Sequence, residues 1–144
     1  MAASKKVKTG LSVGLLILLG LAVFSYFSFT TVVVSGNSME PTFANGRRLL
    51  ASSAYFLVGG IKKNDIVVIK GTKGEEYIIK RVYRMEGEKV EWVFAPEDYP
   101  VDGPEFVVPK GTVFVLGDNR GVSEDSRKYG PVPLSRIIGK VVVR

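Results

Sequence analysis

The chain begins with one long apolar stretch and continues with several short alternating ones. Residues 10–29 contain no charged side chain and are rich in Leu, Val, Ile and Phe. A helix rises about 1.5 Å per residue, so one of this length crosses a hydrocarbon core of about 30 Å. We therefore predict a single N-terminal transmembrane anchor at residues 10–29.

A cleaved secretion signal is the alternative interpretation of this stretch. Such signals have an apolar stretch of about 7–15 residues followed by a small-x-small site. Here the apolar stretch is longer, and its exit at residues 25–29 reads Ser-Tyr-Phe-Ser-Phe, which matches that site poorly. The pattern favours a retained anchor, with a secreted β domain that has lost the segment as the alternative.

Beyond residue 29 the apolar positions mostly recur with a period of two, in short runs rich in β-branched residues. This period is typical of half-buried strands. Four prolines between residues 95 and 110 predict a loop there, and Glu86-Gly87-Glu88 is short enough to join two strands as a hairpin. We predict a mainly β, antiparallel domain over residues 30–144, with strands near 30–34, 65–70, 76–84, 89–94, 112–116 and 138–143.

The positive charges before the apolar stretch predict its orientation. Lys5, Lys6 and Lys8 precede the stretch, and the next basic residue is Arg47. By the positive-inside rule, residues 1–9 form a cytoplasmic tail and the domain lies outside the membrane. We expect membrane lipid as a partner. The net charge is +6, but the basic residues of the domain are scattered and do not alternate with aromatic ones, so we expect no nucleic-acid partner.

The chain contains no histidine and no cysteine. This excludes Ser-His-Asp triads, Cys-His nucleophiles and metal sites built on imidazole or thiolate, and we expect neither a metal nor a cofactor. If a serine acts as a nucleophile here, lysine is the side chain best suited to accept its proton.

One lysine stands in an apolar strand. In the run 77–83, Ile78, Lys80 and Val82 alternate onto one face. A lysine among branched aliphatic residues is desolvated, which lowers its pKa from about 10.4 and suits it to act as a general base. Snorkelling of its amine from the strand edge remains the structural alternative.

A dense polar segment, residues 117–127, directly follows the apolar strand predicted at 112–116. Loops at strand ends often carry functional side chains on a rigid scaffold. The same Asx, Gly and Ser residues also form ordinary turns, and Asp125 with Arg127 would make a structural ion pair. Both interpretations stay open on these residues alone.

Taken together, these segments resemble the type I signal peptidases, membrane-anchored Ser-Lys endopeptidases that remove signal peptides. Ser-Gly-Asn-Ser-Met-Glu-Pro-Thr at 35–42 is similar to the family's nucleophile box, and Lys80-Arg81-Val82 to its base-bearing strand. Gly-Asp-Asn-Arg at 117–120, followed by Ser-x-Asp-Ser-Arg at 123–127, resembles a third box. The boxes follow the apolar stretch in the order typical of the family, and the resemblance covers nearly the whole chain.

The resemblance implies a role for each matching residue. Ser38 would attack the scissile carbonyl, with its own backbone N–H stabilising the oxyanion, and Lys80 would accept and return the proton. Ser123 would orient the lysine amine by a hydrogen bond. The residues expected to support the loop beneath the site are Asp118, Asp125 and Arg127.

The chain departs from the family pattern at two positions that matter below. Some relatives, chiefly the larger ones, carry a serine two positions before the nucleophile, and its hydroxyl completes the oxyanion hole. This chain has Gly36 there, like the short Gram-positive forms. A second oxyanion donor is therefore unassigned. The family's usual glycine before the next strand is Asn64 here, which changes a turn rather than the chemistry.

The resemblance also implies the substrate, a secretory preprotein bound as an added strand with small residues at positions −1 and −3. Met39, next to the nucleophile, is a candidate substrate contact, with core packing as its alternative. Phe43, Phe56 and Leu57 are candidates for a membrane-facing apolar rim or for the core.

Two other functions remain to be distinguished. A self-cleaving Ser-Lys protease shares a related catalytic core but would lack the anchor. A catalytically silent membrane-tethered binding module would be expected to have lost Ser38 or Lys80, and both are present.

Overall fold

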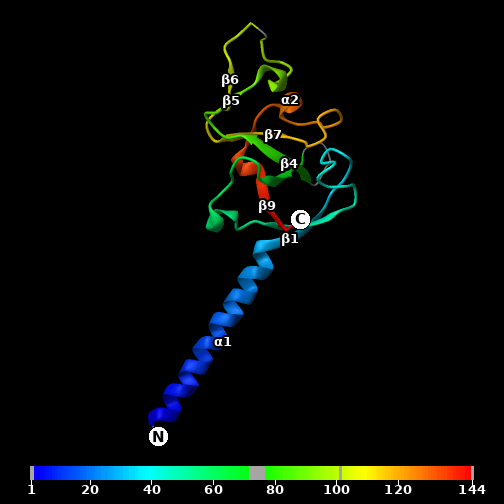
Figure 1. The fold of residues 1–144 in the computed structure, drawn as a ribbon. Helices are drawn as coiled ribbons and strands as arrows, with labels where there is room; N and C mark the ends of the chain where they lie inside the picture. The colour runs from blue at the N-terminus through cyan, green and yellow to red at the C-terminus, as the bar shows by residue number, and fades with distance from the viewer. Residues whose placement is uncertain (1, 72–76, 101, 144) are drawn as a thin grey trace.

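The structure is a computed structural model that describes residues 2–71, 77–100 and 102–143. A single helix, α1 (Ala2–Ser28), extends away from the β domain, and β5 and β6 lie at the opposite end (Figure 1). The helix thus includes most of the segment predicted as a tail. In the described part of the chain, no helix combines the length and the apolarity needed to cross a membrane.

The change from helix α1 to strand β1 is explained by the residues at the junction. Phe29-Thr30-Thr31-Val32-Val33 favours an extended backbone, and β1 begins there at once. The carbonyl of Ser28 accepts a hydrogen bond of 2.9 Å from the N–H of Ser53, which satisfies one of the carbonyls at the end of the helix. The end of the helix is therefore tied to the end of a second strand.

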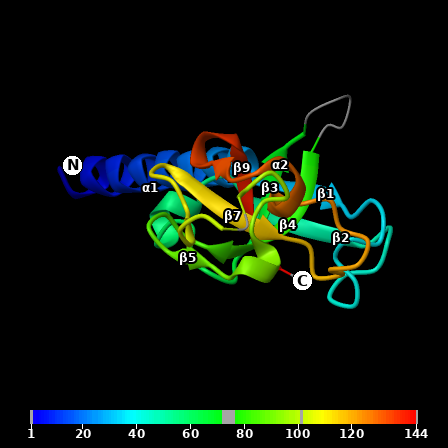
Figure 2. The same cartoon turned by 90° about the horizontal axis from the view of Figure 1, so that it is seen from above.

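Seven antiparallel strands form the main sheet in the order β1-β2-β9-β3-β4-β7-β8, and β5 pairs separately with β6. Figure 2 shows β9, β3, β4 and β7 at the centre of the domain. The strands are β1 (Phe29–Val33), β2 (Arg48–Ser52), β3 (Ile66–Lys70), β4 (Tyr77–Arg84), β5 (Lys89–Val90), β6 (Phe106–Val107), β7 (Thr112–Leu116), β8 (Val132–Pro133) and β9 (Ile137–Val143). The short helices are η1 (Tyr55–Val58), η2 (Trp92–Phe94), α2 (Ser126–Tyr129) and η3 (Leu134–Arg136).

The predicted antiparallel β architecture is confirmed, and most of its strands are present. The strand predicted at 89–94 stops after Val90 and turns into η2, while the predicted loop contains the two residues of β6. The hairpin predicted across Glu86-Gly87-Glu88 is wrong, because β5 pairs with β6 and not with β4. Glu76, the predicted first residue of one strand, lies outside the described residues.

Both faces of β4 are covered. Ile79 packs in a core cluster with Val68 from β3, and Val82 packs in a second cluster with Val67 and Val115. Alternation places Lys80 on the same face as Val82, and only 5% of its surface is exposed. The prediction that this lysine points into an apolar interior is therefore confirmed.

Asn64 occupies a backbone conformation that side chains rarely adopt. Its φ is 71°, and no other described residue except glycine has a positive φ. Its N–H donates to the carbonyl of Val82 at 2.8 Å, and its own carbonyl accepts from Arg81 Nη1 at 3.0 Å. Asparagine and glycine tolerate this left-handed region best, which explains how either residue can serve at this turn.

We predict that Asn64→Ala lowers the free energy of unfolding by about 1–2 kcal/mol, since alanine pays the left-handed penalty in full. Asn64→Gly is the matched control and should keep or slightly raise stability. Chemical denaturation monitored by tryptophan fluorescence measures both. Equal destabilisation by both variants would mean that the asparagine side chain, and not its backbone, holds the turn.

Candidate active site

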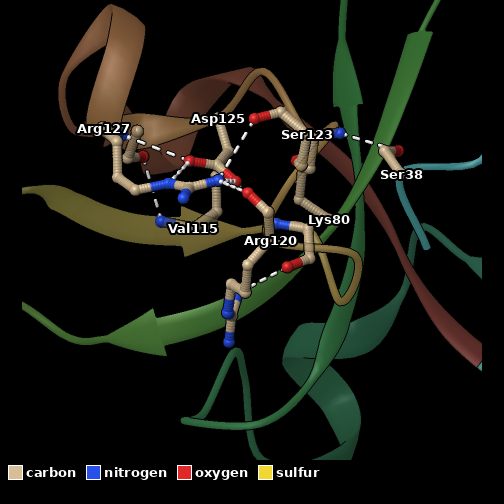
Figure 3. A network of polar contacts seen from close by, with 9 residues as sticks. Ser38, Lys80, Val115, Arg120, Ser123, Asp125 and Arg127 are labelled. Carbon is tan, nitrogen blue, oxygen red and sulfur yellow. Dashed lines mark hydrogen bonds and ion pairs between the residues drawn. The ribbon is translucent and has the colours of Figure 1, made fainter. Parts of the chain in front are cut away.

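Ser38 and Lys80 are brought together from two distant parts of the chain. Ser38 lies in the turn that follows β1, and Lys80 lies in the middle of β4. Lys80 Nζ is 2.9 Å from Ser38 Oγ, a hydrogen-bond distance (Figure 3). A half-buried hydroxyl thus meets an amine that is almost completely withdrawn from water.

The turn that carries Ser38 is anchored by buried apolar side chains. Met39 is fully buried and Phe43 is 4% exposed, and both pack in the cluster beneath the turn. The N–H of Phe43 donates to the carbonyl of Met39 at 2.9 Å. This burial favours the packing role for Met39 over the substrate contact. Of the three aromatic and aliphatic rim candidates, Phe43 is in the core, whereas Phe56 and Leu57 are exposed.

Gly117 allows the polar loop to approach Ser38 closely. A Cβ at this position would lie 2.6 Å from the carbonyl oxygen of Ser38 and 2.1 Å from Ser123 Oγ, so no larger residue fits without displacing backbone. Two residues later, the N–H of Asn119 donates to the same carbonyl of Ser38 at 3.0 Å. The loop therefore fixes the backbone of Ser38 directly.

Asp118 is held by an arginine of the base-bearing strand. Its two carboxylate oxygens accept from Arg81 Nε at 2.8 Å and Arg81 Nη2 at 2.7 Å. Desolvation raises the pKa of Asp118, but the hydrogen bonds from Arg81 and from the Thr42 side chain outweigh it and leave this pKa below its usual value. Thr42 belongs to the segment 35–42 that contains Ser38. Asp118 therefore connects the polar loop both to β4, through Arg81, and to this segment, through Thr42.

Asp125 is held by a second arginine, Arg127, which belongs to the loop segment itself. It is fully buried, accepts the N–H of Gly117 at 2.9 Å and pairs with Arg127 Nε at 2.8 Å. Burial raises the pKa of Asp125, but the hydrogen bonds from Arg127 and Gly117 more than offset this and lower it overall. Arg127 Nη2 also donates to the carbonyls of Arg120 and Ser123, which closes the loop (Figure 3).

The structure gives Ser123 a different environment from the one the resemblance implied. Its Oγ is buried and makes no hydrogen bond of standard geometry among the described residues, the expected one to Lys80 included, although it lies near enough to Asp125 to help lower the pKa of that carboxyl. The amine of Lys80 is directed at Ser38 Oγ instead, while the Ser123 hydroxyl packs against Gly117. A buried hydroxyl without a hydrogen bond of standard geometry is unusual, and this one packs beside Gly117, which also approaches the carbonyl of Ser38.

Two backbone groups near Ser38, its own N–H and that of Gly36, are candidates for an oxyanion donor. Across the described residues, no acceptor takes the N–H of Ser38, so this group is available to a ligand. Gly36 has a φ of +79°, and its N–H donates to Asn45 Oδ1 at 3.0 Å. A serine at position 36 would be strained in this conformation, and a second oxyanion donor is again not found there.

Three supporting residues were missed by the sequence reasoning, namely Arg81, Thr42 and Asn119. Arg81 is adjacent to Lys80 and faces the opposite side of β4, so strand alternation could have indicated that it pairs with a carboxylate of the loop. The contacts of Thr42 and Asn119 depend on the close approach at Gly117, which no sequence pattern reports.

Comparison with known proteins finds relatives that align along most of the chain. The model of the family described as "Signal peptidase, peptidase S26" matches residues 7–98 and 93–144. Signal peptidase IB of Staphylococcus aureus (strain COL) is 31% identical over 156 aligned residues, which cover 86% of this chain and 81% of the relative. Signal peptidase I of Bacillus caldolyticus is 32% identical over 151 residues, covering 85% and 82%.

One solved structure is also similar. The crystal structure of a signal peptidase I from Enterococcus faecalis V583 has a TM-score of 0.45 and 23% sequence identity, and the match covers 57% of this chain and 97% of that one. The family model spans both Ser38 and Lys80, and the relatives align along most of their own length. The chain belongs to the signal peptidase family, peptidase S26.

Proposed function

We propose that the protein is a serine endopeptidase that removes N-terminal signal peptides from exported preproteins, with Ser38 as nucleophile and Lys80 as general base. The observation that carries this proposal is the 2.9 Å contact between Lys80 Nζ and Ser38 Oγ, with Lys80 only 5% exposed. Membership of the signal peptidase family supplies the substrate class.

The geometry supports a proton transfer along this contact. Burial of the amine disfavours its charged form, because an ammonium ion loses its hydration there. A neutral amine at 2.9 Å from Oγ is within reach to accept the hydroxyl proton as the oxygen attacks the scissile carbonyl. The same proton then passes to the leaving amine, and water hydrolyses the acyl-enzyme by the reverse route.

The loop holds Ser38 in position for that attack. Asn119 N–H fixes the carbonyl of Ser38, and Asp118 restrains the loop through Arg81. The N–H of Ser38 would then donate to the oxyanion that forms on the substrate. We propose Asp118, Asp125 and Arg127 as supporting residues, together with Ser123, whose buried hydroxyl packs beside Gly117.

We further propose that residues 10–29 anchor the protein as a single membrane span, with residues 1–9 cytoplasmic and the domain outside. The support is the uncharged apolar sequence, the three lysines before it, and the outward apolar side chains of α1. Leu15, Leu16 and Leu18 are more than 60% exposed, a surface that lipid would cover. Ser38 would lie close to the membrane surface, where preproteins emerge.

We predict that Ser38→Ala and Lys80→Ala each reduce cleavage of a preprotein with an Ala-x-Ala site by at least about 1,000-fold. The assay uses the full chain purified in detergent, with gel analysis of the cleaved product. Ser135→Ala and Lys110→Ala are matched controls on exposed residues outside the three boxes and should retain activity. Normal processing by either dyad variant would exclude the mechanism, and an inactive wild type would favour the silent binding module.

For the anchor, we predict that the full chain remains with membranes after alkaline carbonate extraction. A charged side chain at the centre of a span costs about 2.5–3.5 kcal/mol, so Leu18→Lys should shift protein into the soluble fraction. Val93→Lys makes the same change on an exposed residue of the domain and should not. Complete release of the wild type would contradict a retained span.

A further inference from the structure

The hydroxyl of Tyr77 bridges two strands that are not neighbours in the sheet. It accepts a hydrogen bond of 2.9 Å from the N–H of Val33 and donates one of 3.2 Å to the carbonyl of the same residue. Tyr77 is the first residue of β4, and Val33 is the last residue of β1. The ring of Tyr77 packs against the core cluster beneath the nucleophile turn, which orients the hydroxyl.

Val33 presents its backbone groups at the open edge of β1. This strand is the last in the order of the main sheet and pairs with β2 on its other side. Val34 faces β2, because its N–H donates to Arg47 and its carbonyl accepts from Gly46. Backbone groups alternate along an antiparallel strand, so the N–H and carbonyl of Val33 point away from β2.

A peptide strand added to the edge of β1 near Ser38 would hydrogen-bond to the N–H and carbonyl of Val33. Val33 precedes Ser38 by only five residues, and an extended peptide could pair with this edge as an added strand. Within the described residues, β7 pairs with β4 only from Arg81 onward, so no strand of the sheet lies between Tyr77 and the open edge of β1. The Tyr77 hydroxyl thus occupies both hydrogen-bonding groups that the peptide needs.

We propose that Tyr77 gates the substrate-binding edge: its hydroxyl closes the Val33 position in the free enzyme and must release it before a signal peptide can pair with β1. This rests on the function proposed above. The binding-competent state is the one with Val33 released, and the apparent affinity for substrate is reduced by the fraction of molecules in that state. Tyr77 therefore acts as a positioning residue and takes no part in proton transfer.

The test is Tyr77→Phe, which keeps the ring and removes both hydrogen bonds. Since a hydrogen bond contributes modestly in net terms, we expect KM for an extended signal-peptide substrate to fall by roughly 2- to 10-fold with kcat unchanged. In the Ser38→Ala background, the dissociation constant of the same peptide should fall by the same factor. Tyr55→Phe is the matched control, because the Tyr55 hydroxyl also donates to a backbone carbonyl, that of Ile137 at 3.3 Å.

The possible outcomes separate this proposal from the proposed function. An unchanged or higher KM for Tyr77→Phe, or a lower kcat accompanied by a lower Tm, would mean that the hydroxyl merely braces β1 and would overturn the gate. An equal fall in KM for Tyr55→Phe would overturn it as well. Failure of the wild type to cleave the peptide would instead count against the peptidase function itself.

Discussion

The contact between Lys80 and Ser38 imposes the main constraint on this domain. At this contact an amine is withdrawn from water and faces a hydroxyl, and that desolvation is unfavourable for the charged form of the amine. The fold achieves this by covering both faces of β4, so that Lys80 shares its face with Val82 and is 5% exposed. The turn after β1 then places Ser38 Oγ 2.9 Å from that amine.

The two acidic residues of the loop are both neutralised by arginines. Asp118 and Asp125 lie close to the site in sequence and in space, yet each has its oxygens engaged by an arginine, Arg81 and Arg127 respectively. These contacts hold the loop in place: Asp118 ties it to β4 through Arg81, and Asp125 accepts the N–H of Gly117. Gly117 is where the loop comes closest to Ser38, because only a residue without a side chain fits between the Ser38 carbonyl and the Ser123 side chain.

Sequence patterns predicted those parts of the molecule that depend on local periodicity and on motif order. Alternation placed Lys80 in the interior, and β3, β4, β7 and β9 follow the predicted strands closely. β2 was missed because Arg-Leu-Leu-Ala-Ser contains no β-branched residue, and its pairing with β1 and β9 is a tertiary effect. Arg81, Tyr77 and the present packing of Ser123 depend on contacts across the folded chain, which one sequence does not encode locally.

The dependence of single-turnover cleavage on pH tests the role of Lys80 most directly. With purified full chain in excess over a preprotein, the rate constant should rise with pH through one lysine-type ionisation and then level off, because only the neutral amine can accept the Ser38 proton. Unfolding measured at the same pH values separates this rise from changes in stability. A rate constant that stays flat from about pH 6 to about pH 10 would contradict Lys80 as the general base.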